Sequence, residues 1–377
     1  MKILLAPDSF KSSLSSNEVC NILYNELINQ IPDLKITRLP QSDGGEGSLE
    51  VISEILNADE ITLTVSGPFS NSVDTKYLYN KKNKTAYIES ALAYGLTLIP
   101  RDKKDCKKAS SYGSGELIKH AVLTGAKRII VFLGGSAGND GGTGLASALG
   151  YVFYDKYGNQ LKGSGENLIK INEIDNSGYI FRNMDIKIIA ACDVDNPFYG
   201  PNGAAITYSA QKGASAKETE MLDKGMKNLA NKISTKFNIN IQNIPGSGAA
   251  GGLGGGLSAF LFAELQSGAD IIAEITALDK HIKDADLIIS GEGSIDTQTL
   301  HNKLLRKLCL RAQKHSVPVW SVCGYFEGNN KLKSDIGIQK IFSLVKSKEE
   351  IQHSVKNART GLKTICKEIA WNITSKI

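Results

Sequence analysis

The sequence of 377 residues lacks the apolar segments that mark membrane and secreted proteins. Its longest nearly uncharged stretch, residues 249–263, is crowded with glycine and shorter than the ~18 residues that a membrane span needs. The N-terminal run MKILLA ends at Pro7 and Asp8. That run is too short for a signal peptide and predicts a buried first strand, so cytoplasmic is the expected location.

Several motifs that carry chemistry are also missing. The six cysteines form no CxxC or Cys/His cluster, and the five histidines show no metal spacing, which argues against structural zinc and a disulfide framework. The net charge is only +5 and no basic block appears, so nothing favours nucleic acid. The chain has no Gly-Lys dipeptide, which excludes a P-loop kinase, and no GxSxG motif.

The composition that remains describes an ordinary globular protein, with 41% hydrophobic and 22% charged residues, and the length predicts two domains. Apolar runs near residues 2–6, 128–133, 185–192, 286–290 and 317–323 predict strands that alternate with helices. This rhythm indicates an α/β fold with largely parallel sheets. Residues 60–90 favour antiparallel strands instead. We therefore expect one domain inserted into the other, with residues 63–279 interrupting a domain made of 1–62 and 280–377.

Two capping boxes predict helix starts, because a serine and a glutamate three residues later can satisfy each other's backbone N–H groups. Ser15 and Glu18 open a helix expected to run to about residue 29, and Ser347 and Glu350 are expected to open a long C-terminal helix. The strand at 286–290 is expected to end before the loop GEGSID, and the strand at 317–323 before Gly324.

About half of the 37 glycines fall in four short segments, at residues 44–47, 134–144, 246–256 and 291–293. Glycine between a strand and a helix lets backbone N–H groups approach a phosphate. The alternative, tight turns and close helix packing, stays open for each segment. Gly246, Gly248 and Gly251 match the dinucleotide pattern GxGxxG, but no buried strand is predicted before them, so nicotinamide binding is disfavoured.

Carboxylates and lysines accompany these segments. Where loops leave predicted strands, the chain places Asp8, Asp43, Asp193, Asp195, Glu292 and Asp296. Ligands of open α/β sheets bind at the carboxyl ends of strands, and Mg²⁺ prefers one or two carboxylates plus phosphate and water oxygens. Lys11, Lys212 and Lys303 supply cations for a phosphate or a carboxylate. These residues predict an α/β enzyme that handles phosphate, without identifying its substrate.

The order of the motifs along the chain carries a family resemblance. APDSFKSSLSS, SDGGEGS, LGGSAGNDGGTG, ACDVDNP, PGSGAAGG and SGEGSIDTQTLHNK follow one another almost from end to end. The chain resembles the glycerate kinase family of the bacterial type, the one-chain glycerate 2-kinases that are not P-loop enzymes. The resemblance implies ATP and Mg²⁺ as cofactors and direct in-line transfer onto D-glycerate to give 2-phosphoglycerate. It also implies an active site in the cleft between the two domains, no nucleic acid or membrane partner, and a monomer or homodimer.

Site residues follow from the resemblance together with the local chemistry. Catalytic roles are expected for Asp193 or Asp296 as base and for Lys11, and metal binding for Asp193, Asp195 and Glu292. Substrate or nucleotide binding is expected for Asp8, Ser9, Asp43, Gly44, Gly45, Glu46, Gly134, Gly135, Ser136, Asn139, Asp140, Gly141, Gly142, Lys212, Gly251, Gly252 and Lys303.

The chain also departs from the family pattern. The family usually has arginine at positions 294 and 112, occupied here by Ser294 and Tyr112, and threonine where this chain has Gly138. It usually has glycine at Ser12 and Asn302. Two lost guanidinium groups would weaken bidentate binding of a carboxylate or phosphate. A kinase for another small hydroxy acid, or a catalytically weak metabolite-binding protein, therefore remains an alternative.

Overall fold

The computed structural model describes residues 1–11, 13–300 and 303–375, and the chain divides into two compact units. Unit 1 comprises Met1–Asp43, Glu50–Ile55 and Ala269–Ile377, and unit 2 comprises Gly44–Leu49 and Leu56–Gly268. Unit 1 is thus built from both ends of the chain and unit 2 from its middle. The sequence placed the boundaries at residues 62 and 280, whereas the main changes between compact units fall at residues 55 and 268.

Unit 1 is organised around a five-stranded parallel sheet in the order β14-β13-β12-β1-β2. Apolar residues alternate between its two faces, with Ile3 and Leu5 in one core and Leu4 and Ala6 in another. A strand buried on both faces reads as a continuous apolar run, which confirms the predicted parallel α/β architecture. The strands are β1 (Lys2–Leu5), β2 (Lys35–Arg38), β12 (Leu287–Ile295), β13 (Val319–Phe326) and β14 (Lys340–Val345).

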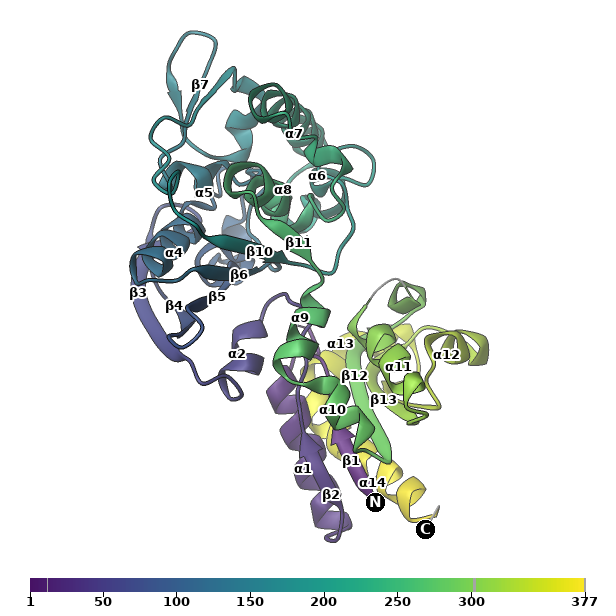
Figure 1. Cartoon of the computed structure of the whole chain (residues 1–377). Helices are drawn as coiled ribbons and strands as arrows, with labels where there is room; N and C mark the ends of the chain where they lie inside the picture. The colour runs from purple at the N-terminus through teal and green to yellow at the C-terminus, as the bar shows by residue number, and fades with distance from the viewer. Residues whose placement is uncertain (12, 301–302, 376–377) are drawn as a thin grey trace. The chain divides into compact units, whose positions relative to one another are not determined.

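Helices cover both faces of this sheet (Figure 1). One face packs against α1 (Ser16–Gln30) and α14 (Ala358–Thr374), the other against α10 (Leu278–Lys283), α11 (Leu304–Lys314) and α12 (Asn330–Ile336). The capping box of α1 is confirmed, because the backbone N–H of Ser15 donates to Glu18 Oε2 at 3.0 Å and that of Glu18 to Ser15 Oγ at 3.3 Å. Shorter helices are α9 (Gly268–Ile275) and α13 (Ile351–Lys356), while α2 (Ser48–Ser53) contains residues of both units.

Three expectations for unit 1 are wrong. Strand β12 continues beyond residue 290 to Ile295, and β13 continues through Gly324 to Phe326, because the two strands pair along this whole length. A Cβ on Gly291 would lie 2.2 Å from the carbonyl oxygen of Val322, so glycine here serves close strand pairing and not a turn. The Ser347 side chain caps nothing: a 3₁₀ turn at Lys348–Glu350 and α13 follow, and the long C-terminal helix begins only at Ala358.

Unit 2 contains a six-stranded sheet in the order β11-β10-β6-β5-β4-β3. The four strands from β5 to β11 are parallel, while β3 and β4 form the antiparallel edge predicted for residues 60–90. Helices α4 (Tyr112–Leu123) and α8 (Ala249–Leu261) pack against one face through Leu117, Ile118, Leu253 and Leu257. The strands are β3 (Asp59–Ser66), β4 (Ser72–Asn80), β5 (Thr85–Glu89), β6 (Arg128–Phe132), β10 (Lys187–Ala191) and β11 (Glu264–Gln266).

Helices α6 (Ala204–Tyr208) and α7 (Ala216–Phe237) and a small antiparallel sheet form a second layer beyond α8 (Figure 1). Phe153, Leu168, Met226 and Phe260 join them in one core with α8. The other helices of unit 2 are α3 (Ala91–Tyr94) and α5 (Thr143–Ala148). A small antiparallel sheet holds β7 (Val152–Tyr154), β8 (Gln160–Leu161) and β9 (Glu173–Asp175). No described helix has the length and apolar character needed to cross a membrane.

Candidate active site

The sheet of unit 1 reverses its strand order between β1 and β12, and such switch points are where open α/β sheets bind ligands, beyond the carboxyl ends of the strands. Asp8 lies there, three residues after β1, and its backbone N–H donates to the carbonyl of Gly291 in β12 at 2.9 Å. Its carboxylate accepts a 2.6 Å hydrogen bond from the Ser9 N–H and is only 8% exposed. Burial raises the pKa of Asp8 well above its ordinary value, and the nearby Asp43 carboxylate raises it further.

Lys11 balances part of the negative charge of Asp8 and Asp43. Its ammonium group donates to Asp43 Oδ2 at 3.1 Å, and the Asp43 charge raises the lysine pKa. Glu292 lies inside β12, where it accepts a 2.8 Å hydrogen bond from the hydroxyl of Thr299, and burial raises its pKa. Asp8, Asp43 and Glu292 thus carry more charge than Lys11 can balance. The group suits a cation or a hydroxyl that must lose its proton.

Asp296 and Lys303 border the same edge of the sheet. The Lys303 ammonium lies 3.9 Å from both Glu292 Oε2 and Asp296 Oδ1, which are loose ion pairs. Asp296 is half-buried and accepts the Gln298 N–H at 2.7 Å. The structure therefore brings the unit 1 residues that the sequence singled out into one acidic cluster with two lysines.

In unit 2, the glycine-rich segment 44–49 lies against the loop that leaves β6. Glu89, the last residue of β5, is buried and accepts the N–H groups of Gly47 at 2.9 Å and Leu49 at 3.2 Å. A Cβ on Gly134 would lie 2.7 Å from the Cα of Gly45, so the two backbones touch. This approach brings Gly44, Gly45, Glu46, Gly134 and Gly135 to one place.

The loop after β6 presents unpaired backbone donors. The N–H groups of Gly134, Gly135 and Ser136 donate to no acceptor in the described part of the chain, although Ser136 is 5% exposed. The carbonyl of Gly135 is used, because it accepts the Leu96 N–H at 2.7 Å and so fixes the loop. Backbone N–H groups at the carboxyl edge of a parallel sheet are a recurrent anion site, and buried orphan donors need a partner.

Lys212 adds a buried cation to this loop. Its ammonium group donates to Ser136 Oγ and to the carbonyl of Gly138, both at 2.8 Å. The residue is 4% exposed and, among the described residues, no carboxylate lies within ion-pair distance of it. Burial lowers its pKa to about 8. The Asp140 charge acts on it from a distance, but an ammonium group that keeps one donor and makes no ion pair among the described residues fits a phosphate or carboxylate.

Asp140 is a buried carboxylate that holds the loop after β6 in place through the hydrogen bonds it accepts. Its Oδ2 accepts the N–H and the hydroxyl of Ser111, both at 2.7 Å, and the Gly144 N–H at 3.2 Å. Its Oδ1 accepts the Gly142 N–H at 3.1 Å and the Tyr94 hydroxyl at 3.2 Å. Five donors occupy a fully buried carboxylate, so the structure gives Asp140 a positioning role between α4 and α5.

The glycines of residues 246–256 serve close packing. Ala250, Gly251 and Gly252 interrupt α8 with three left-handed residues, and the carbonyl of Gly251 accepts the Gly141 N–H at 3.1 Å. A Cβ on Gly251 would lie 2.0 Å from the carbonyl oxygen of Gly138, and one on Gly252 2.4 Å from Met226. Packing is thus what the structure shows for this segment, and ligand binding by Gly251 and Gly252 stays a prediction.

Asp193 and Asp195 follow β10 in unit 2, the first half-buried and the second exposed. Glu292, the third expected metal ligand, belongs to unit 1. No group of three or more potential ligands gathers for a metal within the described residues. Mg²⁺ ordinarily takes only one or two protein carboxylates, so the pair on the β10 loop and the acidic cluster of unit 1 both have suitable donors.

Several contributing residues were missed from the sequence: Glu89, Tyr94, Ser111 and Thr299. Glu89 carried a usable signal, because it ends the apolar run TAYIE, where a carboxylate reaches the edge of the sheet. Ser111 and Tyr94 carried none, since only the fold brings them to Asp140.

The positions where the family has arginine are both exposed: Ser294 on β12 and Tyr112 at the start of α4. Ser12 and Asn302 lie outside the described residues.

Comparison with known proteins identifies the chain. Residues 3–374 match the model of the glycerate kinase family. The chain belongs to this family. It is 38% identical to the glycerate 2-kinase of Escherichia coli K12, over 98% of this chain and 97% of that one. It is also 38% identical to the glycerate kinase of Bacillus cereus ATCC 10987, over 100% and 99% of the two chains.

A solved structure extends the likeness to the fold. The crystal structure of a protein from Salmonella typhimurium LT2, assigned as glycerate kinase 2, has a TM-score of 0.81 and 34% identity, and the match covers 100% of this chain and 99% of that one. The resemblance seen in the motifs is therefore confirmed, and with it the α/β architecture. Membership of the glycerate kinase family makes the chain an enzyme, a kinase.

Proposed function

We propose that this kinase transfers the γ-phosphoryl group of ATP to the 2-hydroxyl of D-glycerate in one direct step. The observation that supports it best is the acidic cluster at the switch point of unit 1, where Asp8, Asp43 and Glu292 face a single closely bound lysine, Lys11. A hydroxyl must be oriented and lose its proton during phosphoryl transfer, and a carboxylate held near other carboxylates has the raised affinity for a proton that this needs.

Unit 2 supplies the complementary charge in this proposal. The N–H groups of Gly134, Gly135 and Ser136, which have no acceptor among the described residues, would hold phosphate oxygens, with the Lys212 ammonium completing the anion site. Asp140 and Glu89 would act on the phosphates only through the loops that they position. That the acidic cluster and this anion site serve one substrate in a cleft between the domains stays a prediction.

ATP and Mg²⁺ fit the residues present. When bound, ATP supplies the transferable phosphoryl group and Mg²⁺ neutralises part of the phosphate charge. Asp193 and Asp195 would hold the metal ion, with Glu292 in support. Lys11 and Lys303 would orient the substrate carboxylate or the transferred phosphoryl group. Asp193 and Asp296 remain candidate bases, and Asp8 is a third. The proposal places the enzyme in the cytoplasm, as a monomer or homodimer.

A kinase for another small hydroxy acid is the second candidate, and one observation favours it. The two positions where the family usually has arginine carry exposed Ser294 and Tyr112, so two bidentate donors for a carboxylate or phosphate are missing. A substrate panel of D-glycerate, L-glycerate, lactate, tartronate and malate separates the two candidates by their kcat/KM values.

The test is an assay of ADP release with ATP, Mg²⁺ and D-glycerate, with the product identified by phosphorus NMR. Turnover to 2-phosphoglycerate supports the proposal, and 3-phosphoglycerate contradicts the assigned position. Direct transfer predicts no exchange of label between ADP and ATP when glycerate is omitted. ATP binding without turnover on any hydroxy acid would leave only the metabolite-binding alternative.

Substitutions of Asp193 and Asp296 test their proposed roles as the catalytic base. Asp193→Asn and Asp296→Asn should each lower kcat by about 10²-fold or more, the usual contribution of an acid–base group, with little change in melting temperature. Asp335→Asn is the matched control, because Asp335 is an exposed carboxylate of α12 in unit 1. If either variant turns over at the wild-type rate, the corresponding role is wrong.

A further inference from the structure

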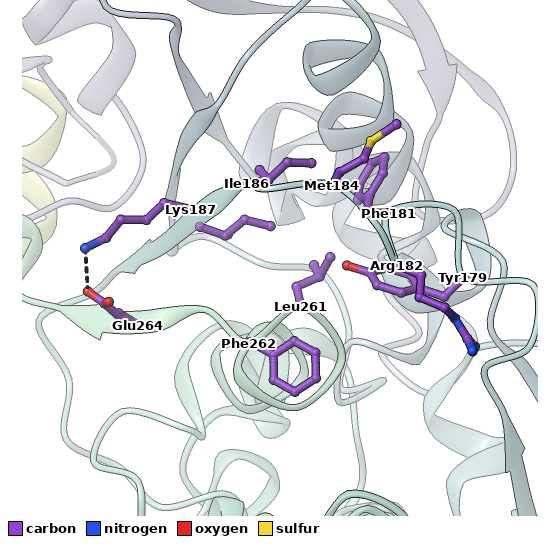
Figure 2. A pocket seen from close by; sticks show the side chains of 10 residues that line it. Tyr179, Phe181, Arg182, Met184, Ile186, Lys187, Leu261, Phe262 and Glu264 are labelled. Carbon is purple, nitrogen blue, oxygen red and sulfur yellow. Dashed lines mark ion pairs between the residues drawn. The ribbon is translucent and has the colours of Figure 1, made fainter.

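A pocket of unit 2 lies at the amino ends of β10 and β11, the opposite end of these strands from the loop that carries Asp193. Its volume is about 310 Å³, at the lower end of the ~300–1,000 Å³ range of small-molecule sites. Phe181, Ile188 and Leu261 form a buried apolar floor. Figure 2 shows Phe262 on one side of Leu261 and Met184, beside Phe181, on the other, so aromatic and thioether groups flank the space.

Phe262 has an unusual conformation for a large side chain. It ends α8 with φ 54° and ψ 33°, the left-handed region, and its side chain is 68% exposed. Comparable positions carry Gly213 after the Ala210–Lys212 turn, Gly337 after α12 and Asn238 after α7, which are residue types that adopt this region more readily than phenylalanine does. A bulky residue in this region costs on the order of 1–3 kcal/mol, and such strain is often kept where a residue contacts a ligand, which motivates the search for one beside Phe262.

The side chains that line the pocket carry two positive charges and one negative charge. The Lys187 ammonium and Glu264 Oε2 form an ion pair of 3.2 Å on one rim (Figure 2). Arg182 adds a second cation; its guanidinium donates to the carbonyl of Asn176 at 2.6 Å, and its charge also acts on the Asp175 carboxylate, with which no ion pair forms among the described residues. Tyr179 also lines the pocket, and burial raises its pKa to about 12, so its hydroxyl is a neutral donor.

We propose that this pocket binds a small planar aromatic acid, with the ring between Phe262 and Met184 and the acid group on Arg182. An aromatic ring stacks on aromatic side chains with about 0.5–1.5 kcal/mol beyond its buried area, and a guanidinium binds a carboxylate in bidentate fashion. The pocket is a second site. It lies at the amino ends of β10 and β11, while the loop of Gly134 to Ser136 follows the carboxyl end of the parallel neighbour β6.

The test uses 2-naphthoate as the probe and calorimetry on the full chain, in the absence of ATP and glycerate. Saturable binding at one site per chain is expected. Phe262→Gly should weaken it by about tenfold, the equivalent of ~1.4 kcal/mol, and Arg182→Gln should weaken it by a similar factor. Phe262→Gly should fold at least as well as the wild type, since glycine suits φ 54°, so lost binding is not lost folding.

Two controls distinguish binding in this pocket from nonspecific binding of the probe to the protein surface. Trp371→Ala removes an aromatic ring of the same 68% exposure from α14 in unit 1 and should leave the affinity unchanged. The neutral analogue 2-methylnaphthalene should bind at least about tenfold more weakly if the acid group contacts Arg182. The proposal is overturned by three outcomes: no saturation into the millimolar range, unchanged affinity in both pocket variants, or a concentration-dependent dimer that Phe262→Gly abolishes.

Discussion

Asp8 in unit 1 and Asp140 in unit 2 are both buried carboxylates near the carboxyl edge of a sheet, yet their surroundings differ. Asp140 accepts hydrogen bonds from five donors, which oppose the rise in its pKa that burial causes. Asp8 accepts one from Ser9, the residue that follows it, and the nearby Asp43 and Glu292 add to the effect of burial on its pKa.

This difference distinguishes a carboxylate that positions loops, Asp140, from one that can bind a cation or move a proton, Asp8. A carboxylate whose lone pairs are filled by backbone and hydroxyl donors has no capacity left for a substrate and stabilises the loops around it. A carboxylate that is buried among like charges destabilises its ionised form, which is the usual arrangement at a site that binds a cation or moves a proton. The four predictions below test this contrast, from the largest expected effect on the free energy of unfolding to the smallest.

Asp140→Asn should have the largest effect. Oδ1 and Oδ2 both face only donors, so either orientation of the amide places its NH₂ group against N–H or O–H groups. We expect a loss of about 3–5 kcal/mol in the free energy of unfolding, the usual result of breaking a buried charged network. The midpoint of urea unfolding, followed by far-UV circular dichroism, measures it. Tyr94→Phe removes one donor alone and should lose only about 1 kcal/mol.

Gly251→Ala should have the next largest effect. The residue has φ +70°, and the added Cβ would lie 2.0 Å from the carbonyl oxygen of Gly138, so the variant combines backbone strain with overpacking. We expect a loss of about 2–4 kcal/mol. Gly293→Ala in β12 is the control in unit 1: the nearest neighbour of its Cβ would be the backbone nitrogen of Lys11 at 3.4 Å, and its change should stay within about 0.5 kcal/mol. Equal losses in both variants would contradict the packing role.

The same glycines show how far the sequence could be read. Apolar runs located the parallel strands because burial on both faces leaves a direct pattern, as in Ile3 to Leu5. Glycine has no such pattern: Gly291 looks like a turn residue, yet it pairs inside β12 because the Val322 backbone approaches too closely for a Cβ. Partners that are far apart in sequence, such as Ser111 and Asp140, meet only through the fold, so the division into positioning and reactive carboxylates required the structure.

Lys212 gives a pH-dependent test of the anion site, and it rests on the proposed function. Burial depresses its pKa from 10.5 to about 8, so its contribution to stability is present above pH 10.5 and is lost as the pH falls through about 8. The unliganded enzyme should therefore gain stability between pH 8 and 10.5, and Lys212→Met should lack this gain. A bound anion needs the ammonium form, so the Kd for ATP should rise by up to about tenfold per unit above pH 8. An equal rise of the Kd in Lys212→Met would contradict the assignment.

Asp8→Asn should have the smallest effect on stability, and its sign is opposite to that at Asp140. The asparagine carbonyl can keep the Ser9 hydrogen bond, and the repulsion from Asp43 and Glu292 disappears. Because the folded-state pKa of Asp8 is raised, its contribution to stability is present below about pH 3.8 and is lost as the pH rises. The variant should therefore match the wild type at pH 3 and have a slightly higher urea midpoint at pH 8.

Activity supplies the second half of the Asp8 comparison. If the acidic cluster handles the substrate hydroxyl or the metal ion, kcat should fall by about 10²-fold or more in Asp8→Asn, although the fold is no weaker. A variant that gains stability while it loses turnover is what a strained reactive group produces, because the same repulsion that opposes folding raises the affinity of Asp8 for a proton. A variant that loses both would make Asp8 a positioning residue like Asp140, and the base would then have to be sought at Asp193 or Asp296.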